Sequence, residues 1–268
     1  MKIPIVVVNW NGSADTVNCL NSIFNQSYSE YEVFLVDNGS EYDDVQILKD
    51  NYADDPRVNL ILNSKNLGYT DAHNIILSQL LDSKDSYQYI FLLNNDTEIK
   101  ENCLEELVRN VNETKADIVA CKMLNYFDHS KIDSAGLMMI NTGEILPTGS
   151  GDDADKFKER ENVIGASGGA AFYSVEMLRS VGLFDSYFNT GYEDAELGLR
   201  ATLAGCKVLF EPNAIVLHKV STSIDQIRDF NYTVKIQTDV FYTCLKLLPF
   251  TVLCLNLPFV LIKYAGIL

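Results

Sequence analysis

Basic residues are scarce in this sequence. The chain has 21 Lys and Arg residues against 37 Asp and Glu residues, which gives a formal net charge of -16. A surface that binds nucleic acid draws its affinity from clustered Lys and Arg, so nucleic acid is excluded as a partner. An anionic substrate would be repelled unless a divalent cation or a local group of hydrogen-bond donors neutralised it.

Closely spaced cysteines are also absent. The six cysteines lie far apart, no two of them form a C-x-x-C pair, and no histidines accompany them. The spacing therefore predicts neither a zinc site nor a disulfide framework, and we expect buried, reduced thiols. The first residues show neither a basic segment nor a cleavage site of small residues, so we expect a cytoplasmic protein.

No long hydrophobic run is present. Residues 247–262 are free of charge but are interrupted by Pro249 and Pro258, so the segment is too short and too broken for a membrane span. Lys246 and Lys263 flank it and aromatic side chains lie near it, which favours a segment in the headgroup layer at the inner face of the cell membrane. The alternative is a helical hairpin packed on its own domain or on the partner of a homodimer.

Glycine-rich phosphate loops are missing after the first apolar run. Residues 9–13 contain one glycine, Gly12, where a dinucleotide-binding turn needs G-x-G-x-x-G. A nucleotidyltransferase would need a glycine-rich, basic loop at the same place to hold a triphosphate. The sequence thus argues against a dinucleotide-dependent dehydrogenase and against a nucleotidyltransferase.

Short apolar runs alternate instead with amphipathic stretches. This rhythm predicts an α/β fold with a mostly parallel sheet flanked by helices. We expect one domain over residues 1–221, with halves at 1–124 and 125–221, and a helical appendage at 222–268. The predicted strands are residues 3–8, 33–37, 58–63, 89–93 and 118–123, and the predicted helices are residues 17–24, 45–52, 70–81 and 101–111.

Polar residues follow four of these strands. In such sheets ligands bind outside the carboxyl ends of the strands, so these residues are expected on one rim. They are Asn9, Asn11, Asp37, Asn38, Asn66, Gly68, Asn94, Asn95 and Asp96. Residues 125–162 show no hydrophobic periodicity. The segment is long for a connection in a compact domain, which favours a binding flap.

Three residues are candidates for chemistry, each with an alternative. Asp96 after an apolar strand could hold a hard divalent ion, but it could equally cap the next helix. Asp194 lies in an acidic cluster that suits a general base, although acidic residues also favour a helix start. His218 ends an apolar strand and could be a metal ligand or a core histidine.

Taken together, residues 5–217 resemble the family 2 glycosyltransferases of the GT-A fold, in particular their bacterial rhamnosyltransferase-like branch. The order of the motifs carries the resemblance. The matching segments are residues 5–11 with the opening strand and T-Y-N-G turn, 36–40 with V-D-N-G-S, 66–69 with N-L-G-F/Y, 92–98 with L-L-N-x-D-T-E, and then Gly168, Gly169, Gly182, Phe184, Asp185, Phe188 and the E-D pair Glu193 and Asp194.

The resemblance implies roles for single residues. Residues 1–124 would bind the nucleotide, with Asp37 reading a pyrimidine base, Asn9 and Asn11 lining the pocket, and Gly68 letting the backbone approach the donor. Residues 125–221 would bind the acceptor. The remaining implied roles are a Mg2+ or Mn2+ ion at Asp96 with His218 as a further ligand, Asp194 as catalytic base, and Glu193 beside it in the acceptor site.

Two positions depart from the family pattern. Asn94 replaces the first carboxylate of D-x-D, so one carboxylate remains for the ion. His73 stands where relatives have an arginine that neutralises the diphosphate, and it could substitute only when protonated.

The expected activity is inverting transfer of a sugar from a nucleotide diphosphate donor to a saccharide or lipid-linked saccharide acceptor. The resemblance favours rhamnose from its thymidine diphosphate donor, in cell-surface polysaccharide or O-antigen synthesis. The alternative is a non-catalytic module of a glycan assembly complex that binds nucleotide sugars.

Overall fold

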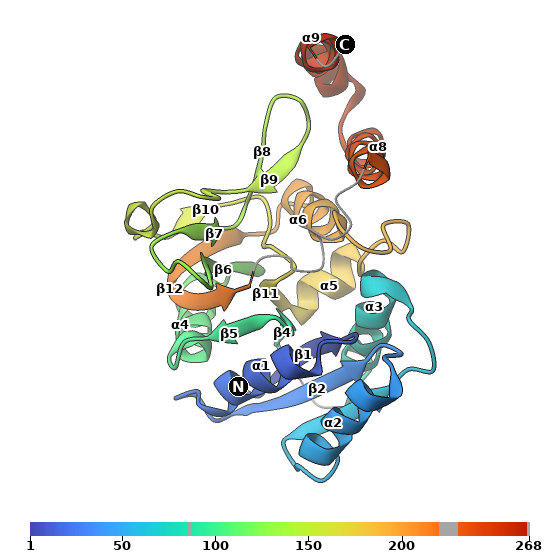
Figure 1. Cartoon of the computed structure of the whole chain (residues 1–268). Helices are drawn as coiled ribbons and strands as arrows, with labels where there is room; N and C mark the ends of the chain where they lie inside the picture. The colour runs from blue at the N-terminus through green and yellow to red at the C-terminus, as the bar shows by residue number, and fades with distance from the viewer. Residues whose placement is uncertain (85–86, 220–229, 267–268) are drawn as a thin grey trace.

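The computed structural model describes residues 1–84, 87–219 and 230–266. Its centre is one large sheet with the strand order β10-β12-β6-β11-β4-β1-β2-β3 (Figure 1). Six of these strands run in one direction, and β11 (Ala170–Ser174) is antiparallel to both of its neighbours. The six are β1 (Ile3–Asn9), β2 (Tyr31–Asp37), β3 (Val58–Leu62), β4 (Tyr89–Asn94), β6 (Ile118–Asn125) and β12 (Val208–His218).

Helices cover both faces of the sheet because alternate strand residues point into two separate cores. Ile5 and Val7 of β1 lie in one core, whereas Val6 between them lies in the other. The first core takes side chains from α1 (Ser13–Phe24), α2 (Tyr42–Tyr52) and α4 (Cys103–Thr114). The second takes them from α3 (Gly68–Leu81), α5 (Val175–Val181) and α6 (Glu193–Leu203). The predicted α/β fold is confirmed.

The segment after β4 differs from the prediction. The chain turns at Asn95 and Asp96 and enters a short strand, β5 (Thr97–Ile99), which pairs antiparallel with β12. Helix α4 begins only at Cys103, with Asn102 as its N-cap. Asp96 therefore does not cap a helix, because a strand and not a helix follows it.

Residues 125–162 contain more regular structure than the sequence predicts. β7 (Ile132–Ser134) extends the sheet beside β6, and β10 (Glu161–Asn162) extends it beside β12. Between them β8 (Leu137–Met139) and β9 (Ile145–Pro147) form a separate hairpin. A 3-10 turn, η1 (Ala154–Lys156), precedes β10. These strands are too short for a hydrophobic period to reveal them.

The C-terminal region forms two helices, α8 (Phe230–Leu247) and α9 (Phe250–Ala265). The Cys244 thiol of α8 donates to the carbonyl of Gly143 in the β8–β9 turn at 3.5 Å, and Leu247 packs against Ile145 and Leu199. α8 thus packs on its own chain. α9 lies farthest from the sheet in Figure 1. None of the described helices is long and apolar enough to cross a membrane.

Candidate active site

The loops after β1 and β2 are joined by a buried network around Asn9 and Asp37. The Asn9 amide donates to Asp37 Oδ2 at 2.9 Å and to Asp44 Oδ2 at 2.7 Å, and its oxygen accepts from Thr16 Oγ1 at 2.8 Å. Asp37 Oδ1 accepts the N–H groups of Gly39 and Ser40. Asn9 is fully buried and Asp37 is 1% exposed, so without a sugar donor their contact holds the loops after β1 and β2 together and neither side chain lines a surface.

Asn38 links the same loop to the start of α3. Its amide donates to Asn66 Oδ1 at 3.0 Å and to the carbonyl of Gly68 at 3.1 Å. Asn66 Oδ1 also accepts the Gly68 N–H at 2.7 Å. Gly68 has a φ of +80°, and a Cβ there would lie 1.8 Å from Asn189 Oδ1. Any other residue here would be strained by the positive φ and would have to displace the Asn189 side chain.

Asn11, Asn95 and the exposed Trp10 form the outer part of this rim. Asn11 Oδ1 accepts the Glu41 N–H at 2.8 Å, and the Asn95 amide donates to the Gly12 carbonyl at 3.3 Å. Trp10 is the single tryptophan of the chain, and it is 56% exposed. Sequence reasoning gave Trp10 no role, although a large exposed aromatic residue directly after a central strand is a usable signal.

His73 does not meet the role that the sequence suggests. It is fully buried, its Nδ1 lies 2.8 Å from the Tyr69 carbonyl, and its ring packs on the Tyr69 ring with centroids 4.0 Å apart. Burial lowers the pKa of His73 to about 4, so the imidazole is neutral at pH 7. His73 therefore supplies no positive charge to a diphosphate.

Asp96 and His218 lie together at the ends of β4 and β12. His218 Nε2 is 3.4 Å from Asp96 Oδ1, and His218 Nδ1 is 2.8 Å from Asp133 Oδ2. Burial opposes the charged form of His218, but the two carboxylates raise its pKa to about 10. Sequence reasoning missed Asp133, because its place beside His218 depends on the pairing of β7 with β6.

A divalent ion would displace the proton on His218 Nε2, because a metal-binding imidazole must be neutral. The Asp96 and His218 pair fits such an ion in two respects. Asp96 Oδ1 is buried and has no hydrogen-bond partner among the described residues. The His218 Nδ1 contact with a carboxylate is the arrangement that orients a metal-binding imidazole. No group of three or more His, Cys, Asp or Glu ligands occurs in the described part of the chain, so phosphate and water oxygens would have to complete the coordination.

The turn formed by Gly168 and Gly169 joins this pair to Asp194. The Gly168 N–H donates to Asp194 Oδ2 at 2.7 Å, and the Gly169 carbonyl accepts the Asn94 N–H at 3.0 Å. A Cβ at Gly169 would lie 3.7 Å from His218 Cε1, and one at Gly168 would lie 3.4 Å from Asp194 Oδ2. The structure thus brings Asn94, Asp96, Asp194 and His218 around one turn.

Glu193 and Asp194, the acidic pair, begin α6 and differ in their surroundings. Asp194 accepts backbone N–H groups on both oxygens at 2.7 Å, whereas Glu193 Oε2 has no partner among the described residues. Burial raises the pKa of both groups, and it raises that of Glu193 to about 8 with a further contribution from Asp194. The backbone N–H groups stabilise the carboxylate form of Asp194, whereas Glu193, with a pKa of about 8, holds its proton at neutral pH.

The raised pKa of Glu193 predicts a pH-dependent stability. An acid with a pKa near 4.5 when unfolded and about 8 when folded binds more protons in the folded state between those values, so stability falls as pH rises through this window. Glu193→Gln should remove this pH dependence. The difference in free energy of unfolding between the variant and wild type should therefore shift by about 1–4 kcal/mol in favour of the variant from pH 5 to pH 8. Urea unfolding at the two pH values measures it, with exposed Glu176→Gln as control. An equal pH dependence in wild type and Glu193→Gln would contradict the prediction.

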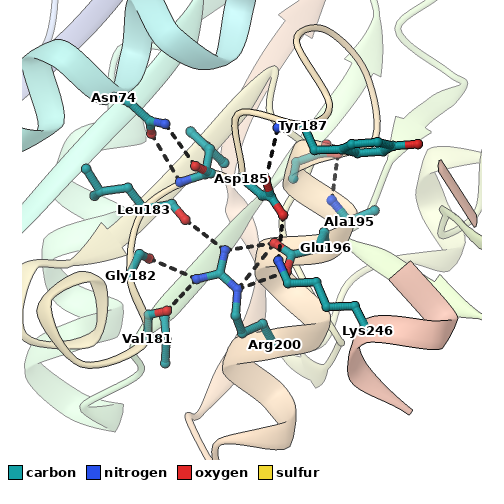
Figure 2. A network of polar contacts seen from close by, with 12 residues as sticks. Asn74, Val181, Gly182, Leu183, Asp185, Tyr187, Ala195, Glu196, Arg200 and Lys246 are labelled. Atoms are coloured by element: carbon teal, nitrogen blue, oxygen red, sulfur yellow. Dashed lines mark hydrogen bonds and ion pairs between the residues drawn. The ribbon is translucent and has the colours of Figure 1, made fainter. Parts of the chain in front are cut away.

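A buried charge network holds α6 from the side of the C-terminal helices (Figure 2). Glu196 is fully buried and accepts from Arg200 Nη2 at 2.7 Å and from Lys246 Nζ at 2.8 Å. Arg200 also donates to the carbonyls of residues 181–183, and Lys246 donates to Asp185 Oδ2 at 2.6 Å. The loop before the acidic pair is thus tied to α6 and to α8.

The fold is that of the GT-A glycosyltransferases. The solved structure of GalNAc-T7 with UDP, GalNAc and Mn2+ has a TM-score of 0.67 at 18% identity, over 81% of this chain and 44% of that chain. TarS 1–349 of S. aureus in complex with UDP has a TM-score of 0.61 at 17% identity, over 93% of this chain and 67% of that chain. At these identities the likeness establishes the fold alone.

The sequence narrows this class to one family. Residues 5–182 match the description Glycosyl transferase family 2, and the chain belongs to that family. Glycosyltransferase GlyG of Streptococcus pneumoniae serotype 4 is 31% identical over 124 residues, which are 46% of this chain and 40% of that protein. O-antigen biosynthesis protein RfbC of Myxococcus xanthus is 27% identical over 241 residues, which are 85% of this chain and 18% of that protein. The chain spans less than half the length of either relative.

Proposed function

We propose that the chain transfers a sugar from a nucleotide diphosphate donor to a hydroxyl of a saccharide acceptor, with inversion at the anomeric carbon. The observation that carries this proposal is the convergence of Asp96, His218 and Asp194 on the Gly168–Gly169 turn. Such a reaction needs an ion to stabilise the leaving diphosphate and a base to take the proton of the acceptor hydroxyl, and both must lie at the same edge of the sheet. Family membership and the GT-A fold support it.

Asp194 is the general base of this proposal. Each carboxylate oxygen has two lone pairs, and the contacts with Gly168 and Ala195 use one on each oxygen, so acceptor capacity remains. Asp194 takes the proton of the acceptor hydroxyl while that oxygen bonds to the anomeric carbon and the bond from this carbon to the donor phosphate breaks. One displacement inverts the centre, and the electron pair leaves with the nucleoside diphosphate.

The loops after β1 and β2 bind the nucleotide half of the donor. Asp37 reads the pyrimidine base, and Asn11 and Asn95 line the outer rim of the pocket. Asn9 and Asn38 act through the loops that they hold, and Gly68 allows the close backbone approach. Residues 1–124 are thus the nucleotide half and residues 125–221 the acceptor half, with Glu193 in the acceptor site.

A bound Mg2+ or Mn2+ would stabilise negative charge on the leaving diphosphate. Asp96 and His218 would hold it, and the Mn2+ in the name of the GalNAc-T7 structure supports a divalent ion. Asp133→Asn should weaken Mn2+ affinity by roughly 10- to 100-fold, because the His218 ring loses the partner that orients it. Electron paramagnetic resonance of free Mn2+ measures this affinity. Asp128→Asn is the control, and equal affinity of the Asp133 variant and wild type would remove Asp133 from the site.

Rhamnose from dTDP-rhamnose is the proposed donor sugar, with a role in surface polysaccharide or O-antigen synthesis. The name of the relative RfbC supports this finer proposal. A module that binds nucleotide sugars without catalysis is the second candidate. The buried Asp96 Oδ1, which makes no hydrogen bond within the described residues and lies 3.4 Å from His218 Nε2, and the raised pKa of the acidic pair favour catalysis over that alternative.

A lipid-linked acceptor agrees with the surface of α9. Large apolar side chains on this helix are exposed, namely Phe250, Leu255, Leu257, Phe259, Leu261 and Ile262. We propose that α9 lies in the headgroup layer of the inner membrane face. Sedimentation with anionic vesicles should deplete the protein from solution, whereas a homodimer through α9 would give a doubled mass without vesicle binding.

The test of the proposed function is a panel of nucleotide sugars with and without Mn2+ or Mg2+. Trp10 fluorescence reports binding, because the single tryptophan is exposed beside the Asp37 loop. Metal-dependent binding and hydrolysis of one pyrimidine diphosphate sugar, lost in Asp96→Ala, is the expected result. No binding of any donor would overturn the proposal.

A further inference from the structure

The candidate site needs a cation for a diphosphate, and His73 does not provide it. The net charge of the chain is -16, and Asp15, Asp96, Glu98 and Asp133 all lie around the proposed ion site. A single divalent ion would leave this surface acidic. A second, fixed positive charge would favour the extra negative charge that a leaving diphosphate develops.

Lys219 lies beside Asp96 in the structure. It follows His218 directly at the end of β12, and its backbone N–H donates to the Asp96 carbonyl at 3.1 Å. The pairing of β12 with β5 joins His218 to Thr97, so its continuation sets Lys219 opposite Asp96. Lys219 therefore belongs to the same rim as the proposed ion site.

Two neighbours hold the Lys219 side chain in place. Its ammonium pairs with Asp15 in the first turn of α1, and it lies 4.9 Å from the centroid of the Tyr126 ring. The Tyr126 hydroxyl donates to Glu98 Oε1 at 2.9 Å, which fixes the ring on β5. The side chain is 16% exposed, so it is held in one position and is still open to a ligand.

Within the described residues, the Lys219 ammonium keeps capacity for a further partner. A lysine has three N–H donors, and the contact with Asp15 uses one of them. The start of α1 lies next to the Asp96 turn, because the Asn95 amide donates to the Gly12 carbonyl at 3.3 Å. A phosphate bound at the Asp96 and His218 pair would therefore lie at the same strand end as Lys219, whose charge already acts on the Asp96 carboxylate.

We propose that Lys219 binds the diphosphate of the donor and stabilises it as the leaving group. This inference rests on the proposed function, since it names the residue that contacts the donor phosphates at that site. Lys219 acts as a fixed point charge beside the ion, and it makes the site selective for diphosphates over monophosphates.

The test compares the binding of UDP, UMP, dTDP and dTMP to Lys219→Met, Lys219→Arg and wild type, with Mn2+ present. Lys219→Met should weaken the binding of the diphosphates about 10-fold or more and that of the monophosphates less than about 2-fold. Lys219→Arg should restore most of the affinity. Lys100→Met is the control for the lost charge, since Lys100 is exposed directly after β5. Lys219→Gln replaces the Met variant should that variant fail to fold.

Three outcomes separate the claims. Unchanged diphosphate affinity in Lys219→Met would overturn the role of Lys219. Equal weakening of monophosphate and diphosphate would overturn it too, because the loss would then lie in the nucleotide pocket. If wild type itself bound none of the four nucleotides, the proposed function would fail and not only this inference.

Discussion

Asp194→Asn should lower the turnover of the wild-type donor and acceptor by roughly 10²- to 10⁴-fold, while donor binding stays within about 2-fold. The reason is that an amide cannot take the proton of the attacking hydroxyl, whereas the nucleotide loops around Asp37 do not contact Asp194. Turnover is measured as acceptor product per enzyme, and donor binding by Trp10 fluorescence. Thermal melting checks that the variant keeps the fold.

The matched variants for this experiment are Glu193→Gln and Asp71→Asn. Glu193 is already protonated at neutral pH, so Glu193→Gln should lower turnover much less than Asp194→Asn does. Asp71 lies on α3 and accepts from Ser186, so Asp71→Asn should leave turnover within about 2-fold. Normal turnover in Asp194→Asn would sink the assignment of the base.

Arg200→Met should lower the free energy of unfolding by about 3–5 kcal/mol. Glu196 is fully buried, and loss of its bidentate partner leaves a carboxylate that Lys246 alone compensates (Figure 2). The carbonyls of residues 181–183 lose their donor in the same variant. Urea unfolding followed by circular dichroism measures the change.

Arg57→Met is the control, because Arg57 pairs with Asp55 on the surface and such pairs contribute at most about 1 kcal/mol. A loss of less than about 1 kcal/mol in Arg200→Met would mean that Lys246 suffices for Glu196.

The sequence predicted well the strands of the first half that are apolar runs followed by polar turns, and it predicted the later and shorter strands poorly. β1, β2 and β4 are apolar runs followed by polar turns, so hydrophobic pattern and turn chemistry agree there. β5 has three residues, and its pairing with β12 depends on residues about 120 positions away, which no local pattern carries. The same holds for β7 to β10, where pairing partners decide the structure.

The residues of the candidate site were likewise predictable only where a local sequence pattern marks them. Strand ends identified Asp37 and Asp96 as rim residues, because the carboxyl ends of parallel strands lie together. Burial of single side chains was not predictable, so Asn9, Asp37 and His73 were expected to contact a ligand and are all buried in the structure without a sugar donor. Asp133 and Lys219 escaped notice because their neighbours are set by long-range pairing.

The reversed strand β11 has a consequence for how the site assembles. Because β11 runs against β4 and β6, the turn that precedes it, and not the loop that follows it, reaches the ligand edge. The contacts of Asn9 with Asp37 and Asp44, which join the loops after β1 and β2, span 28 and 35 residues of the chain, so closing these two loops costs less conformational entropy than longer-range contacts do. The base and the ion site need β11 and β12 inserted across long sequence separations, which is slow. A nascent chain would therefore be able to hold a nucleotide before it could cleave the sugar bond, and catalysis would begin only when the last strand is in place.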